Sequence, residues 1–430
     1  MTDQSTKDEL VVIKQLTAGN CGDLPQYAKG IGEEGQWQAG GWHLLQQQVD
    51  LPVAVLSAAA LANNINWMQQ YAVAAGVQLA PHGKTGMLPA IFQQQIERGA
   101  WGITLATVPQ VVVAARAGIR RILLANPLVG RRAMQQVAEL ISQGLEFYCL
   151  VDDPVHLQQL ADFFTDSGVR LQLLIEFGVE GGRGGVRDES QALLLAQQIQ
   201  QCPALALCGI EFYEGVIKAQ QPAPAIRAFV RRCIALLQHC QQQQLFAPGP
   251  VLLTGAGSAW YDLVAETFTV AELPSQVQLL IRPGCYVFFD TGIYLQAQQQ
   301  LLARSPLAAG LGGQLHNALE VWAYVLSRPE PGLAVIGLGK RDMAFDAGLA
   351  QVSQHYRPGR DAPCPADPAW RLLKMMDQHA VMQLPVTADV AVGDMLSFTG
   401  SHPCLTLDKW RYLAVLDEDY QIRTLYPSYF

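Results

Sequence analysis

The chain has 430 residues, 50% hydrophobic and 15% charged, and its 29 basic residues against 37 acidic residues give a net charge of -8. Nucleic-acid-binding proteins present a basic face, so this composition excludes that class as the first interpretation. No apolar stretch approaches the roughly 18 to 20 residues that cross a bilayer, and we expect no membrane partner. Because the N-terminal MTDQSTKDEL also lacks a signal-peptide core, we expect a cytoplasmic protein.

The cysteines predict no disulfide framework. There are nine, an odd number, and no Cys-x-x-Cys pair occurs among positions 21, 149, 202, 208, 233, 240, 285, 364 and 404. In a reducing cytoplasm most of them are expected to be small buried hydrophobic side chains. Cys404 is the exception considered below.

The middle of the chain alternates short apolar runs with amphipathic segments. Strands are predicted at residues 77–81, 101–106, 121–124, 146–151, 170–176, 204–213, 251–255 and 278–282. Helical patterns lie between them, for example at residues 87–98, 134–143, 155–165, 191–201 and 226–243. Eight strands with intervening helices favour an α/β fold, a (β/α)8 TIM barrel. The alternative is an open doubly wound sheet, whose typical first-turn Gly-x-Gly-x-x-Gly is missing.

The pattern changes after Asp290. Residues 318–327 and 413–425 alternate apolar and polar side chains, and Pro and Gly interrupt residues 329–368. These features are typical of short antiparallel strands. We therefore assign residues 51–290 to the barrel and residues 291–430 to a β-rich domain. Residues 1–50, with Trp37 and Trp42, are too short to fold alone and are expected to pack on the β-rich domain.

Two loops after barrel strands point to a phosphate-bearing cofactor. In TIM barrels the active residues lie at the C-terminal ends of the strands. TGAGS, residues 254–258, follows the seventh strand, and Arg282-Pro-Gly284 follows the eighth, which is the usual phosphate site of a barrel. Lys84 follows the first strand, and a lysine opposite a phosphate site can form a Schiff base with pyridoxal phosphate (PLP). The alternatives are a tight turn and a solvated lysine.

A candidate metal site lies in the C-terminal domain. His402 and Cys404 stand two apart in SHPC, and in an extended segment both side chains would point to one face and reach one ion. Two protein ligands would leave coordination positions open for water or substrate. The alternative is a packed histidine beside a buried thiol.

Six motifs occur in an order that resembles the D-serine dehydratase/D-threonine aldolase-like family. From about residue 50 to 415 they are PHGKT, the glycine loop around Arg183, GIEFYEG, TGAGS, RPGCYVFFD, and SHPC followed by DKW. Members of this family are fold-type III PLP enzymes with an alanine racemase-like barrel and a C-terminal β domain. The resemblance is nearest to the bacterial amino acid deaminase, or D-serine deaminase, subgroup.

The resemblance implies a role for each motif. Lys84 would form the Schiff base, Arg183 and Tyr213 would lie near the pyridine ring, and His402 and Cys404 would bind a divalent metal, with zinc expected. The implied phosphate ligands are Gly255, Gly257, Ser258, Gly284 and Tyr286.

Two further expectations come from the same resemblance. His379 falls where the family often has an active-site histidine and is predicted to be catalytic, with an ordinary packed histidine as the alternative. The family also implies a homodimer with a shared active site.

The reaction implied is dehydration and deamination of a small β-hydroxy D-amino acid, such as D-serine, to a 2-oxo acid and ammonia. Lys84 would take the α-proton and the metal would polarise the β-hydroxyl. Family members with His-x-Cys resemble dehydratases and those with His-x-Asp resemble aldolases. The rivals are retro-aldol cleavage, an amino-acid racemase on the same barrel, and a non-catalytic PLP carrier.

Overall fold

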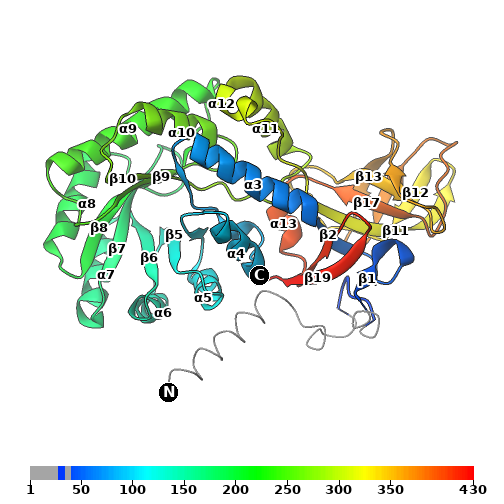
Figure 1. The fold of residues 1–430 in the computed structure, drawn as a ribbon, viewed down its shortest axis with the longest axis horizontal. Helices are drawn as coiled ribbons and strands as arrows, with labels where there is room; N and C mark the ends of the chain where they lie inside the picture. The colour runs from blue at the N-terminus through cyan, green and yellow to red at the C-terminus, as the bar shows by residue number, and fades with distance from the viewer. Residues whose placement is uncertain (1–27, 34–39) are drawn as a thin grey trace, which may run out of the picture.

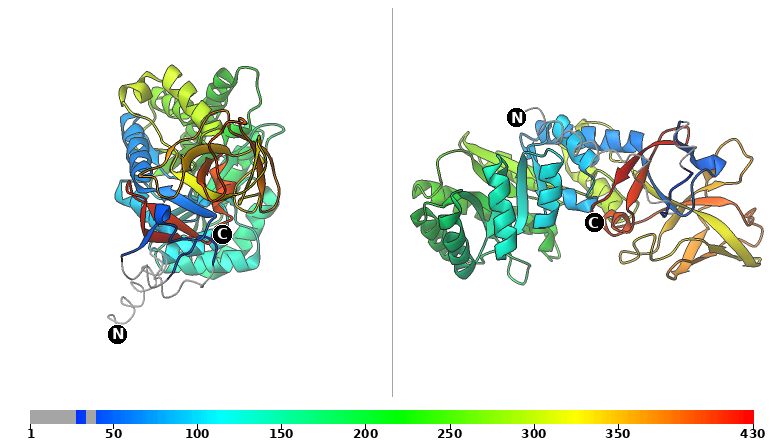
Figure 2. Two further views of the ribbon diagram at one scale, coloured as in Figure 1. Left: turned by 90° about the vertical axis from the view of Figure 1, so that its right-hand side faces the viewer. Right: turned by 90° about the horizontal axis from the view of Figure 1, so that it is seen from below.

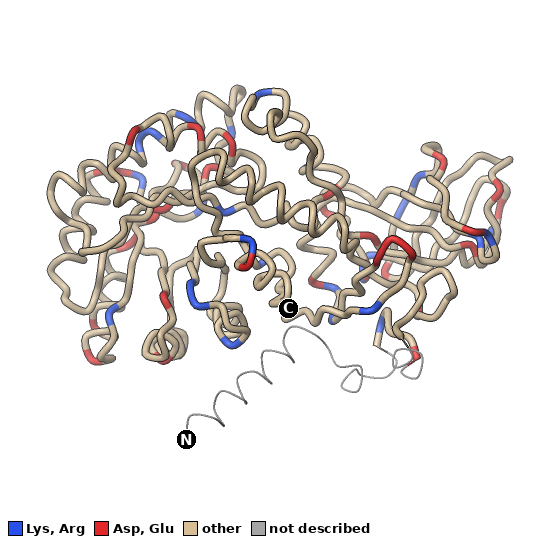
Figure 3. Tube along the Cα trace, viewed as in Figure 1, with Lys and Arg blue, Asp and Glu red and all other residues tan. Residues whose placement is uncertain are grey.

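The computed structural model describes residues 28–33 and 40–430. Two lobes lie side by side, with the barrel at the left of Figure 1 and a β-rich lobe at the right, and the right-hand view of Figure 2 shows the same division. Lys and Arg are interspersed with Asp and Glu along the trace of both lobes (Figure 3). In the described residues, none of the helices has both the length and the apolar character required to cross a membrane.

The first lobe is built on eight parallel strands, as predicted. Their order in the sheet is β3-β10-β9-β8-β7-β6-β5-β4. The two end strands are also joined, since Trp101 N–H donates to Leu79 O (2.7 Å) and Thr104 N–H donates to Pro81 O (2.9 Å). The sheet therefore curls until its edges meet, as in the alanine racemase-like barrel. The strands are β3 (Gln78–Leu79), β4 (Ile103–Leu105), β5 (Arg121–Pro127), β6 (Glu146–Val151), β7 (Leu171–Phe177), β8 (Leu205–Phe212), β9 (Val251–Gly255) and β10 (Val277–Ile281).

Helices connect these strands and cover the outside of the barrel. Several begin with local signals that the sequence contains, such as the capping box of Thr107 and Gln110 at α5 and the Asp153 side chain that accepts the N–H of His156 at α7. Such signals help to fix where these helices begin. The helices are α3 (Ala58–Ala74), α4 (Pro89–Glu97), α5 (Val108–Arg116), α6 (Arg131–Ser142), α7 (Pro154–Ser167), α8 (Glu189–Gln201), α9 (Pro222–Gln242) and α10 (Tyr261–Val270).

Side chains alternate between the two faces of the barrel strands. Ile122 and Leu124 of β5 join the large cluster under the helices, whereas Leu123 between them belongs to a separate cluster with Leu174 and Leu252. Because successive strand residues point to opposite faces, this second cluster fills the interior of the barrel. The barrel interior is therefore packed with side chains below its mouth.

The second lobe contains an eleven-stranded sheet with the path β1-β19-β18-β2-β11-β12-β16-β15, from which β17, β13 and β14 branch. The predicted alternation of residues 318–327 and 413–425 corresponds to β11 and to the β18–β19 hairpin. The strands are β1 (Trp42–His43), β2 (Val53–Ser57), β11 (Leu319–Glu330), β12 (Leu333–Ile336), β13 (Gln351–Tyr356), β14 (Cys364–Pro365), β15 (Arg371–Met375), β16 (Ala380–Gln383), β17 (Met395–Thr399), β18 (Tyr412–Leu416) and β19 (Gln421–Pro427).

The division between the lobes differs from the expected one at both ends. At the N-terminal end, β2 pairs with β11 and β18, so a strand after residue 51 belongs to the β-rich sheet. Trp42 pairs with Ile422 of β19 in the same sheet. Trp37 and residues 1–27 lie outside the described residues.

At the other end, the segment after residue 291 forms helices α11 (Ile293–Arg304) and α12 (Pro306–Gly310) instead of strands. The Asp290 carboxylate accepts the N–H groups of Gly292 (3.0 Å) and Tyr294 (2.8 Å) and starts α11. Arg304 then pairs with Asp262 of α10, which ties this segment to the barrel.

Candidate active site

A cavity of about 190 Å³ lies at the mouth of the barrel, where the loops after the strands meet the second lobe. Eight of the residues predicted from sequence border it together. It is lined by His82, Lys84, Thr85, Ala125, Arg183, Tyr213, Ala256, Gly257, Ser258, Arg282, Gly284, Cys285, Tyr294, His402 and Cys404.

Lys84 lies in η3 (Gly83–Thr85), one turn of 3-10 helix that follows β3. Gly83 allows this tight approach, since a Cβ there would be 2.6 Å from the ring of Phe92. The Lys84 side chain is accessible because it faces the cavity, and the cavity walls still lower the pKa of its amine, mainly by removing water around it. A lowered pKa increases the fraction of neutral, nucleophilic amine.

The loop after β9 approaches its neighbours too closely for side chains. A Cβ on Gly255 would lie 2.3 Å from the ring of Phe212, and one on Gly257 would lie 2.9 Å from the ring of Tyr213. The Ser258 hydroxyl accepts the backbone N–H groups of Gly284 (3.2 Å) and Cys285 (3.1 Å), which links the loops after β9 and β10. Its own hydrogen stays available to an anion.

The cavity wall is positively charged. Of the described residues that line it, Lys84, Arg183 and Arg282 are cations and none is a carboxylate. Arg282 is 5% exposed, and its Nε has no hydrogen-bond partner among the described residues. This charge and the glycine-rich loops fit a small molecule that carries a phosphate and a carboxylate.

Arg282 is fixed from below by the buried carboxylate of Glu211. Its Nη2 donates to Glu211 and to Phe212 O (2.9 Å). Burial raises the pKa of Glu211, while the charge of Arg282 opposes this change. Nearby, the pKa of Glu176 is raised to about 7, mainly by burial and to a smaller extent by the charges of Glu211 and Asp152.

Arg183 lies over the ring of Tyr213, with 5.2 Å between the guanidinium carbon and the ring centroid. This is the geometry of a cation–π contact. Burial raises the pKa of the Tyr213 hydroxyl, which therefore remains protonated. Both predicted neighbours of the pyridine ring thus form one wall of the cavity.

His402 and Cys404 reach the cavity from the second lobe, but not in the extended segment that we expected. His402 has a left-handed backbone (φ 63°) and precedes α13 (Pro403–Leu407), which contains Cys404. His402 Nδ1 lies 2.6 Å from Asp346 Oδ2, so the carboxylate fixes the ring orientation. Pro403 starts the short helix and turns Cys404 toward the barrel, which explains why both side chains still meet one cavity.

Cys404 Sγ lies 3.6 Å from Cys285 Sγ in the cavity wall. The hydrogen bond between these thiols is the main cause of opposite pKa shifts: the pKa of Cys285 falls to about 7 and that of Cys404 rises. Within the described residues, no group of three or more His, Cys, Asp or Glu side chains is arranged to hold a metal ion. His402 and Cys404 are a donor pair suited to an ion whose other ligands are not protein side chains.

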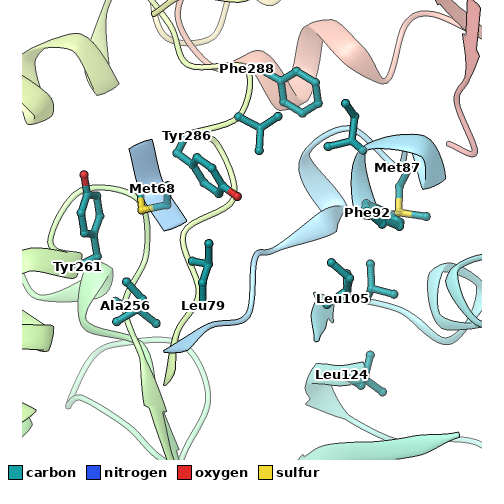
Figure 4. Packing of buried hydrophobic residues seen from close by; sticks show 14 of the residues in the cluster. Met68, Leu79, Met87, Phe92, Leu105, Leu124, Ala256, Tyr261, Tyr286 and Phe288 are labelled. Carbon is teal, nitrogen blue, oxygen red and sulfur yellow. The ribbon is translucent and has the colours of Figure 1, made fainter. Parts of the chain in front are cut away.

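Three predicted residues do not line the cavity. Gly255 is the last residue of β9 and is not among the residues that line the cavity. Tyr286 is buried, and its hydroxyl accepts the Gln95 amide N–H (2.9 Å); Figure 4 shows it among apolar side chains that include Met68 and Leu79. Tyr286 is not among the residues that line the cavity, and its expected phosphate role stays a prediction. His379 lies exposed in the turn between β15 and β16.

Sequence reasoning also missed residues that the structure brings to the site. The Arg282 side chain, Cys285 and Asp290 all lie within RPGCYVFFD, a motif whose position was noticed while these side chains received no role. Tyr294, which lines the cavity, and Asp346, which contacts His402, have no sequence signal, because only the folded chain brings them to these positions.

Comparisons with known proteins agree with this architecture. The model of the alanine racemase N-terminal domain matches residues 56–291, and that of a putative serine dehydratase domain matches residues 318–416. A D-threonine aldolase of an Arthrobacter species is 28% identical over 360 residues, 83% of this chain and 86% of its own. A D-threo-3-hydroxyaspartate dehydratase of Delftia sp. is 26% identical over 391 residues, 87% and 96% of the two chains.

Solved structures give the same fold. D-threonine aldolase from Filomicrobium marinum matches with a TM-score of 0.74 at 23% identity, covering 90% of this chain and 97% of that chain. Structures of the Delftia dehydratase match with TM-scores of 0.71 and 0.70 at 22% identity, covering 92% and 90% of this chain and 99% and 100% of theirs. In the first of these structures a histidine is replaced by alanine. In the second, which is in the metal-free form, the cysteine two residues after that histidine is replaced by alanine.

Proposed function

Because the chain belongs to the family with an alanine racemase N-terminal domain, here joined to a putative serine dehydratase domain, we propose that it is a PLP-dependent lyase. It would eliminate water from a β-hydroxy D-amino acid of the D-serine type and release a 2-oxo acid and ammonia. The observation that carries the proposal is the meeting of Lys84, Ser258, His402 and Cys404 around one cavity.

The residues present fit the cofactor. Lys84 would bind PLP through Nζ, Ser258 and the glycines beside it would hold the phosphate, and Arg183 and Tyr213 would border the ring. When bound, PLP supplies a ring that stabilises negative charge on the substrate α-carbon. The cationic wall supports this assignment, since Arg282 adds a fixed positive charge near the phosphate loops.

Lys84 would also move the proton. Its lowered pKa leaves more of the amine neutral at the pH of the cell, and a neutral amine can accept the α-proton of the substrate. Arg183, exposed at the cavity, would attract the substrate carboxylate and orient the amino acid. The walls around Lys84 remove part of the water around its amine, which strengthens these charge interactions.

His402 and Cys404 would hold a divalent metal, with zinc favoured because a thiolate is a soft ligand. When bound, the ion supplies a Lewis acid for the β-hydroxyl. Asp346 at His402 Nδ1 would leave Nε2 as the donor atom. Support comes from the Delftia dehydratase, in which the exchanged histidine and cysteine are also two residues apart.

Retro-aldol cleavage is the second candidate. It is favoured by the 28% identity to a D-threonine aldolase, and it would use the same lysine and metal donors to break the Cα–Cβ bond. The products separate the two reactions, since an aldolase releases glycine and an aldehyde from the same substrates. Racemisation would change only the stereochemistry, and a carrier would change nothing.

The test is product analysis over a panel of D- and L-amino acids that includes D-serine, D-threonine and 3-hydroxy-D-aspartate. We expect ammonia and a 2-oxo acid from β-hydroxy D-amino acids, and borohydride reduction with peptide mapping should place PLP on Lys84. Lys84→Ala should be inactive, and Lys374→Ala, at an exposed site on β15, is the matched control. Glycine and aldehyde as the only products would replace dehydration by the aldolase reaction.

The metal is tested separately. Chelation should stop ammonia release while PLP stays bound, and added zinc should restore the activity. His402→Ala should resemble the chelated enzyme, and His239→Ala, at an exposed histidine on α9, should resemble the wild type. Full activity of His402→Ala would contradict the metal assignment.

A further inference from the structure

Two cysteine thiols face each other across the junction of the two lobes. Cys285 follows β10 of the barrel and Cys404 lies in the first turn of α13, 119 residues later in the chain, yet their sulfur atoms are 3.6 Å apart. Both residues line the cavity at the barrel mouth, where Cys404 is partly exposed and Cys285 is buried.

Other cysteines in the described part of the chain are in a different situation. Burial raises the pKa of Cys149, Cys208, Cys233 and Cys240, so their reactive thiolate form is rare. Cys364 is exposed on β14, away from the cavity, and its thiol donates to a backbone carbonyl of the neighbouring strand, His355 O (3.5 Å). Cys202, at the end of α8, does not line the cavity. The thiol pair at the barrel mouth therefore combines a position in the cavity wall with an adjacent partner sulfur.

We propose that Cys285 and Cys404 are a redox modification site, which a peroxide converts into a disulfide that blocks the cavity. One sulfur attacks the peroxide, takes one oxygen as a sulfenic acid and releases water. The second thiol then attacks that sulfur and displaces a second water. In total, two thiols lose two electrons and two protons, hydrogen peroxide is reduced to two water molecules, and one S–S bond forms.

The geometry requires only a small movement. The sulfurs must approach from 3.6 Å to about 2.05 Å, the length of an S–S bond. Cys404 lies on a helix of only five residues that follows the left-handed His402, and it is partly exposed. A shift of this short helix can therefore close the bond without moving the barrel strands.

Bond formation would disable the site in two ways. It would remove the Cys404 thiolate as a metal donor, a consequence that rests on the proposed function. It would also pull on the backbone N–H of Cys285, which donates to the Ser258 hydroxyl in the predicted phosphate loop (3.1 Å). A reductant would reverse both effects, because thiol–disulfide exchange restores the two thiols.

The experiment treats the purified holoenzyme with hydrogen peroxide and follows thiol content, non-reducing peptide maps and activity. We expect the loss of two thiols, one peptide that links residues 285 and 404, and a parallel loss of activity that dithiothreitol reverses. Cys285→Ser should lose a smaller fraction of its own starting activity, and Cys364→Ser, the matched control, should respond like the wild type.

Two outcomes would overturn the proposal: the absence of the linked peptide, or inactivation of Cys285→Ser as fast as the wild type and without recovery in dithiothreitol. The linked peptide is detected without any substrate. The pairing of the thiols is therefore tested even if no amino acid in the panel is converted and the proposed function fails.

Discussion

Glu176 allows a quantitative test of the electrostatics under the cavity. It lies at the end of β7, is 6% exposed, and its pKa is raised from 4.5 to about 7 by burial and by the charges of Glu211 and Asp152. A carboxyl with a raised pKa binds its proton more tightly in the folded state. Its contribution to stability is therefore present below pH 4.5 and is lost as the pH rises to about 7.

The size of the effect follows from the shift. Each pKa unit corresponds to about 1.4 kcal/mol, so moving from 4.5 to about 7 corresponds to a loss of roughly 3 kcal/mol in the free energy of unfolding. Glu176→Gln keeps the shape of the protonated side chain and removes the titration. We expect the variant to resemble the wild type at the acidic end of this range and to be more stable at the neutral end.

Urea unfolding at a series of pH values measures this difference directly. Glu266→Gln is the matched control, because Glu266 is an exposed glutamate on α10, paired with Arg227 at the surface. It should keep the pH profile of the wild type. If Glu176→Gln also kept that profile, or were less stable than the wild type at neutral pH, ionisation of the buried carboxyl would not lower the free energy of unfolding. Either result would refute the reasoning.

Two further substitutions test the predicted cofactor and metal positions. Gly284→Ala should destabilise the protein by about 1–3 kcal/mol and weaken PLP retention in dialysis, because the new Cβ would lie 2.5 Å from His82 O. The control is Gly310→Ala, whose Cβ would have no atom within 4 Å and which should not destabilise the protein. Asp346→Asn should lower zinc affinity about 10–100-fold by weakening the contact that orients His402, as measured by competition with a chelator, and unchanged affinity would contradict the orienting role.

The sequence was informative where structure is decided locally. Each barrel strand is a short apolar run, and all eight strands were predicted. Some of the helices between them also carry their own start signal, such as Thr107 at α5 or Asp153 at α7. The motifs at the strand ends placed Lys84 and Ser258 correctly at the barrel mouth. The domain boundary after residue 290 was less accurate, because residues 293–310, assigned to the β-rich domain, form two helices of which Asp290 starts the first.

What the sequence did not reveal are contacts between distant segments. Arg282 meets Glu211 71 residues away, His402 meets Asp346 56 residues away, and Cys285 meets Cys404 119 residues away. None of these pairs has a fixed spacing that a motif could encode. Periodicity predicts which face of an element is buried, whereas the partner of a buried charge depends on how the loops meet after folding.

Asp290 shows why the two halves of the site depend on each other. Its Oδ1 accepts N–H groups at the start of α11 on the barrel side, and its Oδ2 accepts the backbone N–H of His402 (3.3 Å) from the β-rich lobe. Asp290 is 1% exposed, so these bonds are shielded from water. The left-handed backbone of His402 is thus held by a residue of the barrel's last loop, RPGCYVFFD. The position of the proposed donor pair, His402 and Cys404, therefore depends on the contact between the lobes, and the loop that contains Gly284 of the predicted phosphate site also holds the backbone of His402.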